Sequence, residues 1–438
     1  MRDRVSDPLR VLLVTDAVGG VWDSCLALAQ ALGHSGQAKV LLAVVGPPPA
    51  ESQVAAARAV PGLALRQLDG RLEWMEGGRD WLERHRAAAG ALAAEWRADL
   101  VHVNQLGLAG VGEALGRTSG AGGGQGGRRP PVLLGVHSDL VTWWTWVKDG
   151  GEAPRTLPDY LRWQLDLARH ALQQADAVVC PSGFLAGEIT RHYQLDRTPH
   201  VVHNAVALPV DSVNADDETQ EVGRQDDLAV TVAGRAWDEA KNVKLVAEAL
   251  RLCRRPWRLE VAGEVVEPGR PPSAMPAAPG LSYSGFLDKH ALASLLGRAA
   301  LCIAPASYDP FGLGPAEAAL AGCAVVANDI PSYREVWGPA ALYFERNTPG
   351  ALAALLERLS GDRPTVTHYA TLAHARVRAR YTHERMAAAY LGLYRELLGA
   401  TRSGGARSTE QLVEPLAAVA SAPRPLPRPD ALHQTPTP

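Results

Sequence analysis

The first half of the chain alternates short apolar runs with longer amphipathic stretches. The runs have the length of strands and cover residues 9–14, 39–45, 63–68, 100–103, 132–137, 177–180 and 201–203. Stretches between them, such as residues 81–96 and 161–174, repeat their apolar positions at helical spacing. The first helix carries Trp22, Cys25 and Leu32 on one stripe and is expected to end at Gly33. This alternation predicts a doubly wound α/β domain, with helices on both faces of a parallel sheet.

A polar and acidic segment separates this half from a second half with the same pattern. Strand-like runs recur at residues 229–233, 258–262, 281–283, 300–304, 324–327 and 341–344. We expect a domain over residues 1–209, a linker over 210–227 and a second domain over 228–383, followed by a helix at about 384–400. Gly-rich residues 119–129 and Pro-rich residues 267–280 are expected to be surface insertions, and residues 401–438 a disordered tail.

Size and charge narrow the class of protein. At 438 residues the chain is longer than one core usually supports, which agrees with two domains. It carries 44 Lys and Arg against 47 Asp and Glu, a net charge of -3, which argues against binding nucleic acid. A phosphorylated ligand would therefore need a local group of cations and amides.

The same composition bears on location and metals. No apolar run reaches the roughly 18 residues that span a bilayer, and no apolar signal segment precedes the first strand. We therefore expect a cytoplasmic protein, for which peripheral contact with a membrane stays open. The five cysteines are scattered, form no CxxC pair, and predict buried apolar side chains without structural zinc: Cys25, Cys180, Cys253, Cys302 and Cys323.

Residues 301–337 predict a strand, a loop, a short helix and a second strand, which form one βαβ unit. Ligands of such units lie at the carboxyl ends of the strands, here the loop over residues 307–314. This stretch holds two carboxylates, Asp309 in the loop and Glu317 in the expected first helical turn. Gly312 and Gly314 allow a ligand to approach the backbone, and Pro315 fits the first helical position. A turn cap at Asp309 and a helix-dipole partner at Glu317 are the alternative interpretation.

Two cations follow the first strand of the second half, in GRAWDEAKNVKLVAEAL. Arg235 comes directly after the strand and Lys241 at the start of a helix, so both side chains can meet one anion. Solvated surface side chains are the alternative interpretation, and Lys244 is a spare cation three positions later.

The first half contributes a glycine pair and a histidine at strand ends. Gly19 and Gly20 lie in the turn after the first strand, and His137 ends a later strand in VLLGVHSDL. A lone histidine in such a place is more often structural than catalytic. Nearby Trp143, Trp144 and Trp146 are either an acceptor platform or plain packing.

Taken together these motifs resemble the family 4 glycosyltransferases over about residues 9–398. YDPFGLGPAEAALAGCAVVA is similar to the family's nucleotide-sugar loop, in which two acids are separated by seven residues. Asp309 departs from the pattern because the family usually has Glu there. The resemblance implies a GT-B fold, two Rossmann-like domains facing across a cleft, with the helix at 384–400 crossing back onto the first domain. It also implies sugar transfer from a nucleotide-sugar donor with retention of anomeric configuration, the activity of an EC 2.4 hexosyltransferase.

The resemblance also assigns roles to residues. Arg235 and Lys241 would neutralise the donor diphosphate, His137 would touch the donor sugar, and the diphosphate would pack on Gly19 and Gly20. Of the two acids, Asp309 would reach the sugar hydroxyls and Glu317 the ribose. The loop between them would also bind donor, through Phe311, Gly312 and Leu313. The YSGFLDKHAL segment would hold the base through backbone groups of Gly285, Phe286 and Leu287.

The catalytic set implied in this way is His137, Arg235, Lys241 and Asp309. We expect no cofactor and no metal, since the sequence has no Asp-x-Asp pair or His cluster while Arg235 and Lys241 supply positive charge. The sequence does not identify the acceptor, which is a saccharide, a lipid-linked molecule or a small molecule. A nucleotide-sugar epimerase or hydrolase of the same fold, or an inactive donor-binding protein, are the alternative functions. The PSYREV stretch around Glu335 also matches the family, without a role that the sequence supplies.

Overall fold

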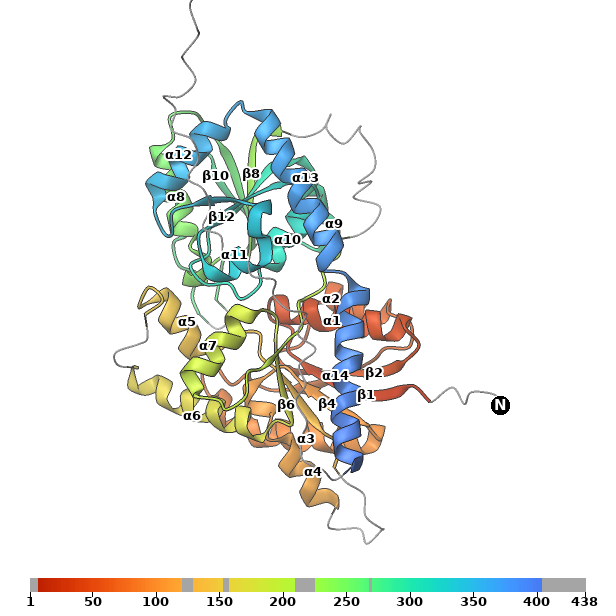
Figure 1. Cartoon of the computed structure of the whole chain (residues 1–438). Coiled ribbons are helices and arrows are strands. Elements are labelled where there is room, and N and C mark those ends of the chain that lie inside the picture. The colour runs from red at the N-terminus through yellow and green to blue at the C-terminus, as the bar shows by residue number, and fades with distance from the viewer. Residues whose placement is uncertain (1–6, 120–128, 153–156, 209–224, 268–269, 404–438) are drawn as a thin grey trace, which may run out of the picture.

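The computed structural model describes residues 7–119, 129–152, 157–208, 225–267 and 270–403. Two α/β domains, each built on its own parallel sheet, lie one above the other in Figure 1. Residues 404–438 of the predicted tail, most of the Gly-rich insertion and residues 210–224 of the predicted linker lie outside the described residues, whereas residues 401–403 are the end of a helix and not part of a tail. The two-domain α/β fold predicted from the apolar pattern is confirmed.

The first domain holds a seven-stranded sheet in the order β3-β2-β1-β4-β5-β6-β7. Every neighbouring pair in it is parallel. The predicted strands are all present, as β1 (Leu9–Thr15), β2 (Ala38–Gly46), β3 (Ala64–Asp69), β4 (Leu100–Val103), β5 (Val132–Gly135), β6 (Ala177–Cys180) and β7 (His200–Val201). Alternate side chains of β1 enter two separate cores, Leu12 and Val14 on one face and Val11 and Leu13 on the other. A sheet buried on both faces needs the continuous apolar runs seen in the sequence.

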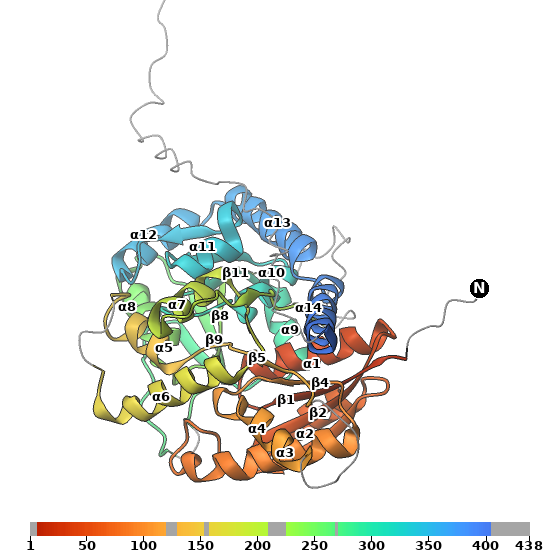
Figure 2. The ribbon, with the colours of Figure 1, turned by 60° about the horizontal axis from the view of Figure 1, so that its bottom comes forward.

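Helices cover both faces of this sheet (Figure 2). They are α1 (Gly20–His34), α2 (Glu51–Arg58), α3 (Leu82–Trp96), α4 (Val111–Ser119), α5 (Leu140–Val147), α6 (Asp159–Gln174) and α7 (Gly183–Tyr193), with short 3-10 turns η1 (Gly78–Trp81) and η2 (Leu106–Leu108). The prediction that Gly33 ends the first helix is wrong. Gly33 stays helical, and Gly36 takes the left-handed conformation (φ 67°) two residues beyond the last helical residue.

The second domain holds a six-stranded parallel sheet in the order β10-β9-β8-β11-β12-β13. Its strands are β8 (Gln225–Arg235), β9 (Arg258–Glu264), β10 (Leu281–Gly285), β11 (Ala299–Ala304), β12 (Ala324–Asn328) and β13 (Leu342–Phe344). Its helices are η5 (Glu239–Lys241), α8 (Val243–Leu252), α9 (Lys289–Arg298), α10 (Leu313–Leu320), α11 (Pro331–Trp337), η6 (Gly338–Ala340), α12 (Pro349–Leu359) and α13 (Arg363–Arg380). Strand β8 begins at Gln225, inside the segment expected to be linker.

The last described helix, α14 (His383–Ser403), leaves the second domain and runs along the first (Figure 1). Its buried Tyr390 and Tyr394 share a core with Trp22 of α1. The Tyr394 hydroxyl lies 2.9 Å from Nδ1 of His102 on β4, a buried contact between residues 292 positions apart. The chain therefore crosses between the domains twice, which restricts how far they can separate.

Candidate active site

The loop between β11 and α10 is built around Asp309. Its Oδ1 accepts hydrogen bonds from the backbone amides of Gly312 (2.9 Å) and Phe311 (3.4 Å), and its Oδ2 accepts one from the Tyr333 hydroxyl (3.3 Å). Gly312 is left-handed at φ 85°, and a Cβ there would lie 2.9 Å from the Tyr333 ring. The carboxylate thus folds the loop, which agrees with the turn-cap interpretation of Asp309.

Asp309 also binds one of the predicted cations. Lys241 Nζ lies 3.0 Å from Asp309 Oδ2, and both side chains are mostly buried. Lys241 ends η5 and precedes left-handed Asn242, so it lies just before α8 and not at a helix start as expected. The structure therefore joins a predicted cation and a predicted acid that are 68 positions apart.

Arg235 is the last residue of β8 and points to the first domain. It pairs with Asp238 at 3.0 Å, and its guanidinium carbon lies 5.6 Å from the centre of the Trp237 ring. A Cβ built on Gly19 would stand 3.9 Å from Cδ of Arg235. The Arg235 side chain, which is 35% exposed, therefore lies beside the glycine pair at the start of α1.

The Gly19–Gly20 pair also lies next to the end of the loop that carries Asp309. A Cβ on Gly20 would lie 3.1 Å from Cδ1 of Leu313, the first residue of α10. A Cβ on Gly314 would lie 2.6 Å from the Val232 carbonyl of β8, so this position requires glycine. Helix α10 begins at Leu313, two residues before the Pro315 start that the sequence suggested. Proline is tolerated there because the first-turn amides have no partner within the helix.

The ring of Phe311 packs in the core of the second domain, while its backbone amide donates to Asp309. The ring is buried and lies 5.1 Å from the Tyr381 ring, centroid to centroid, in an edge-to-face arrangement. In the predicted base segment Gly285 is left-handed at φ 69°, Leu287 is partly buried and Phe286 is 57% exposed. Their backbone groups stand at the carboxyl end of β10, where a ligand of the sheet is expected.

His137 lies at the carboxyl edge of the first sheet, in contact with Asn104. Nε2 of His137 is 3.0 Å from Oδ1 of Asn104, while Nδ2 of Asn104 donates to the Val14 carbonyl at 3.0 Å. Because the amide is fixed in this way, we assign the proton to Nε2, which leaves Nδ1 as an acceptor. Burial lowers the pKa of His137 to about 4, so the ring is neutral at neutral pH.

Glu317 has partners that the sequence did not reveal. It is buried in α10, past the first turn, and its Oε1 lies 2.5 Å from Nζ of Lys289 at the start of α9. The same ammonium lies 2.8 Å from Oδ2 of Asp23, in the first turn of α1. Burial lowers the pKa of Lys289, but the two carboxylates outweigh it and raise the pKa above its usual value. The one signal in the sequence was the place of Lys289, just after the predicted base segment.

Glu335 links the domains at a second point. Its carboxylate accepts from the backbone amides of Gly183 (2.7 Å) and Phe184 (2.8 Å), at the start of α7 in the first domain. Nε2 of His203 lies 3.4 Å away. Burial raises the pKa of Glu335, but these hydrogen bonds outweigh it and the pKa is lowered overall. The PSYREV motif, which had no role in the sequence, therefore supplies an anion to a helix N-terminus.

The tryptophan run serves the interface between the domains. Trp143 donates to Asp238 Oδ1 at 3.1 Å, across the domains. Trp146 donates to Glu188 at 2.9 Å and packs in a small cluster with Tyr308 of the second domain. For these two side chains the packing interpretation of the run holds.

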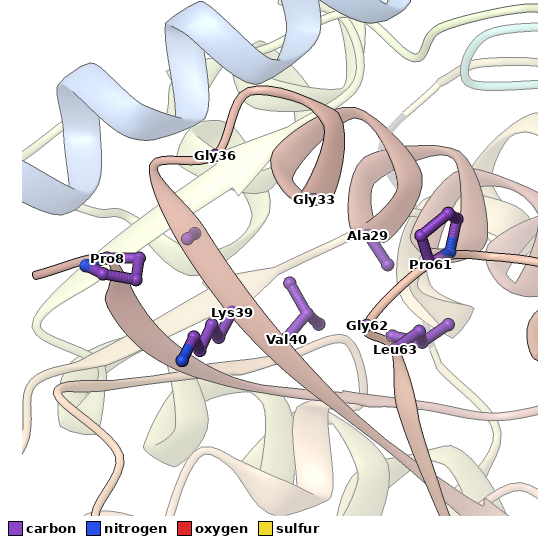
Figure 3. Close-up of a pocket in the computed structure, with 10 residues that line it drawn as sticks. Pro8, Ala29, Gly33, Gly36, Lys39, Val40, Pro61, Gly62 and Leu63 are labelled. Atoms are coloured by element: carbon purple, nitrogen blue, oxygen red, sulfur yellow. The ribbon is translucent and has the colours of Figure 1, made fainter.

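Other features of the described residues lie outside this site. No group of three or more His, Cys, Asp or Glu among them could hold a metal ion, and none of the helices described is long and apolar enough to cross a membrane. A pocket of about 200 Å³ lies at the opposite edge of the first sheet, where Pro8 and Lys39 stand near the starts of β1 and β2 (Figure 3). Sheets of this type bind ligands at their carboxyl edges, so this pocket is not the candidate site.

Two family models match the chain, one over each domain. The model described as Glycosyltransferase Family 4 matches residues 18–208, and the model described as Glycosyl transferases group 1 matches residues 227–362. A search of curated proteins finds no matching sequence.

Solved structures match over nearly the whole chain. Sucrose-phosphate synthase from Thermosynechococcus elongatus has a TM-score of 0.68 at 19% identity, covering 90% of this chain and 100% of its own. A glycosyltransferase from Rickettsia africae has a TM-score of 0.62 at 15% identity, over 90% and 99%. Anabaena HepE in complex with UDP-glucose has a TM-score of 0.62 at 14% identity, over 91% and 100%. At these identities the likeness shows the fold, which is the GT-B fold implied by the motifs.

Proposed function

Since this chain belongs to the family 4, group 1 glycosyltransferases and transfers a sugar from a nucleotide-sugar donor, we propose that it is a hexosyltransferase acting between its two domains. The observation that carries the proposal is that Arg235 lies beside Gly19 of the first domain, while Lys241 pairs with Asp309 in the loop that precedes Leu313, the neighbour of Gly20. These groups come from three segments, each of which follows the carboxyl end of a strand: the Gly19–Gly20 turn after β1, residues 235–241 at the end of β8, and the Asp309 loop after β11.

The proposed donor lies with its diphosphate against both the Arg235 guanidinium and the Gly19–Gly20 turn. Arg235 and Lys241 would stabilise the negative charge that grows on the leaving nucleoside diphosphate as the glycosidic bond breaks. The amides at the start of α1 add to this because a helix N-terminus favours anions. Protein cations at this position would do the electrostatic work that Mg²⁺ does elsewhere, so the proposed reaction needs no metal.

On the first-domain side, the proposed role of His137 is to contact the donor sugar. With Nε2–H bound to Asn104, its Nδ1 can accept a hydrogen bond from a sugar hydroxyl. A neutral ring adds no positive charge beside the oxocarbenium character that develops on the sugar. Asp309 is the proposed partner of the sugar on the other side, where its Oδ2 is held next to Lys241.

The first donor to test is UDP-glucose, because the HepE neighbour was solved with that molecule. Thermal shift with UDP-, GDP- and ADP-glucose selects the base, since a bound donor stabilises the folded state. Transfer is then followed with saccharide and lipid-linked acceptors in EDTA, and the anomeric proton of the product reports retention. Nucleotide release at full rate without any acceptor would instead indicate a hydrolase. Activity lost in EDTA and restored by Mg²⁺ or Mn²⁺ would contradict the metal-independent mechanism.

A further inference from the structure

Lys289 joins three segments that surround the proposed nucleotide. Its ammonium lies 2.5 Å from Glu317 of α10 and 2.8 Å from Asp23 of α1. The first contact lies within the second domain, and the second crosses to the first domain over 266 positions of sequence. Through these two contacts the Lys289 ammonium links the second domain to the first.

The location of this cation relates it to the nucleoside. Lys289 follows Gly285, Phe286 and Leu287, the segment proposed to hold the base, by two residues. Its partner Glu317 is the acid proposed to hold the ribose. Asp23 lies in the first turn of α1, directly after the glycine turn proposed to hold the diphosphate. The three charged groups thus connect the expected places of base, ribose and diphosphate.

The burial of Glu317 indicates what Lys289 does. The side chain of Glu317 is only 8% exposed, whereas those of Lys289 and Asp23 are 40% and 39% exposed. A carboxylate in so dry a place is costly unless it is paired. Among the described residues, Lys289 is the one basic side chain within ion-pair distance of Glu317. Burial raises the pKa of Glu317 and the Lys289 ammonium opposes this rise, so loss of Lys289 would favour the protonated carboxyl, which accepts hydrogen bonds from ribose hydroxyls less well.

We propose that Lys289 is a positioning residue that stabilises the carboxylate form of Glu317 and orients it for the donor ribose, and that its bond to Asp23 couples nucleoside binding to closure of the domains. This inference rests on the proposed function and adds to it a residue outside the motif pattern. The two events are coupled because both depend on the same ammonium. Lys289 completes the ribose site through Glu317, and through Asp23 it holds α1, with its glycine turn, against the second domain.

Calorimetry with UDP, GDP and ADP, followed by steady-state kinetics with the sugar donor of the base that binds, tests the ribose part. Lys289→Met should weaken binding of that nucleotide by about tenfold or more, since a buried charge loses its partner. Lys289→Arg should restore most of the affinity because it keeps the charge. Lys244→Met is the matched control, being 79% exposed with its nearest partner, Glu248, at 3.9 Å, and should bind as the parent does.

Asp23→Asn tests the coupling. It leaves the Lys289–Glu317 pair intact, so the donor KM should stay within about threefold while kcat falls, because α1 no longer closes on the diphosphate. The double variant Asp23→Asn, Lys289→Met should be no worse than Lys289→Met alone, since both changes break the same link.

Three outcomes are decisive. Nucleotide affinity of Lys289→Met within about twofold of the parent would overturn the ribose role, since a lost buried pair costs more than that. Fully additive losses in the double variant would overturn the coupling. A parent protein that binds none of the three nucleotides would instead contradict the proposed donor class, which separates failure of the function from failure of this inference.

Discussion

The two sheets share a strand order, but the side chains at their carboxyl edges differ in charge. Both sheets begin in the order 3-2-1-4-5 when each is numbered from its own first strand, and both present loops to the shared interface. The second domain presents ion pairs there, among them Arg235 with Asp238 and Lys241 with Asp309. The first presents a glycine turn and the neutral His137, whose pKa burial lowers to about 4.

This contrast shows how one fold can divide a reaction between two copies. In the proposed reaction the second sheet carries the cations that face the departing diphosphate, and the carboxylates of Asp238 and Asp309 hold those cations in place. The first domain supplies close backbone approach and the uncharged ring of His137, and its Asp23 carboxylate pairs with Lys289 of the second domain. Four experiments test this division of roles between the domains, and the expected effect decreases from the first experiment to the last.

The largest effect is expected at the cations of the second domain. Arg235→Ala and Lys241→Ala should each lower kcat by roughly a hundredfold, or about 3 kcal/mol of transition-state stabilisation, since both face charge that grows as the bond breaks. Lys244→Ala, which removes an exposed side chain, is the control and should change little. Equal losses at all three positions in steady-state kinetics would show that the assignment is wrong.

The next effect concerns Asp309, which has both a structural and a catalytic interpretation. Asp309→Ala should nearly abolish transfer, because Lys241 and the Gly312 amide both lose their partner. Asp309→Glu should keep nucleotide affinity and lower or redirect selectivity for the sugar. Asp309→Asn separates the interpretations, since it keeps an acceptor for the loop amides and removes the charge. If Asp309→Asn transfers sugar at the parental rate, Asp309 serves only the turn.

A smaller, pH-dependent effect is expected from the buried histidines of the first domain. Burial lowers the pKa of His102 to about 3, from 6.5 in an unfolded chain. The unfolded state therefore binds more protons below pH 6.5, and stability should fall as the pH drops from about 6.5 towards 3. The melting temperature should decrease as the pH is lowered from 7.5 to 5, and it should decrease less steeply with pH in the His102→Gln variant. An identical slope in that variant would assign the decrease to other groups.

The smallest effect is expected at the contact between the domains made by Glu335. Glu335→Gln keeps an acceptor for the α7 amides but removes the charge that favours a helix N-terminus, a loss of about 1 kcal/mol. The thermal unfolding midpoint should fall slightly. Glu83→Gln, in a pair where Glu83 is 71% exposed, should leave the midpoint unchanged. A fall of equal size in both variants would remove the special role of Glu335.

Sequence patterns predicted the strands well because the sheets are buried on both faces and each strand is a continuous apolar run. Helix ends were less predictable: a single glycine was expected to end the first helix at Gly33, but the helix continues to His34 and Gly36 is the glycine with a positive φ. Within the site, the sequence pattern placed Arg235 at the end of its strand and Asp309 in its loop, whereas Lys241 lies in the short η5 turn and not at the helix start that was expected. The pattern could not place Lys289 with Asp23 or Glu335 with Gly183, because these contacts join residues 266 and 152 positions apart and exist only once the domains meet.

The central claim is that the second domain binds the donor through its diphosphate, by means of Arg235 and Lys241 and without a metal. Calorimetry in EDTA, comparing a nucleoside with its diphosphate in the parent and in the Arg235→Ala, Lys241→Ala double variant, tests it most directly. The parent should bind the diphosphate far more tightly than the nucleoside, and the double variant should lose that difference while keeping its affinity for the nucleoside. An unchanged preference for the diphosphate in the double variant would contradict the account.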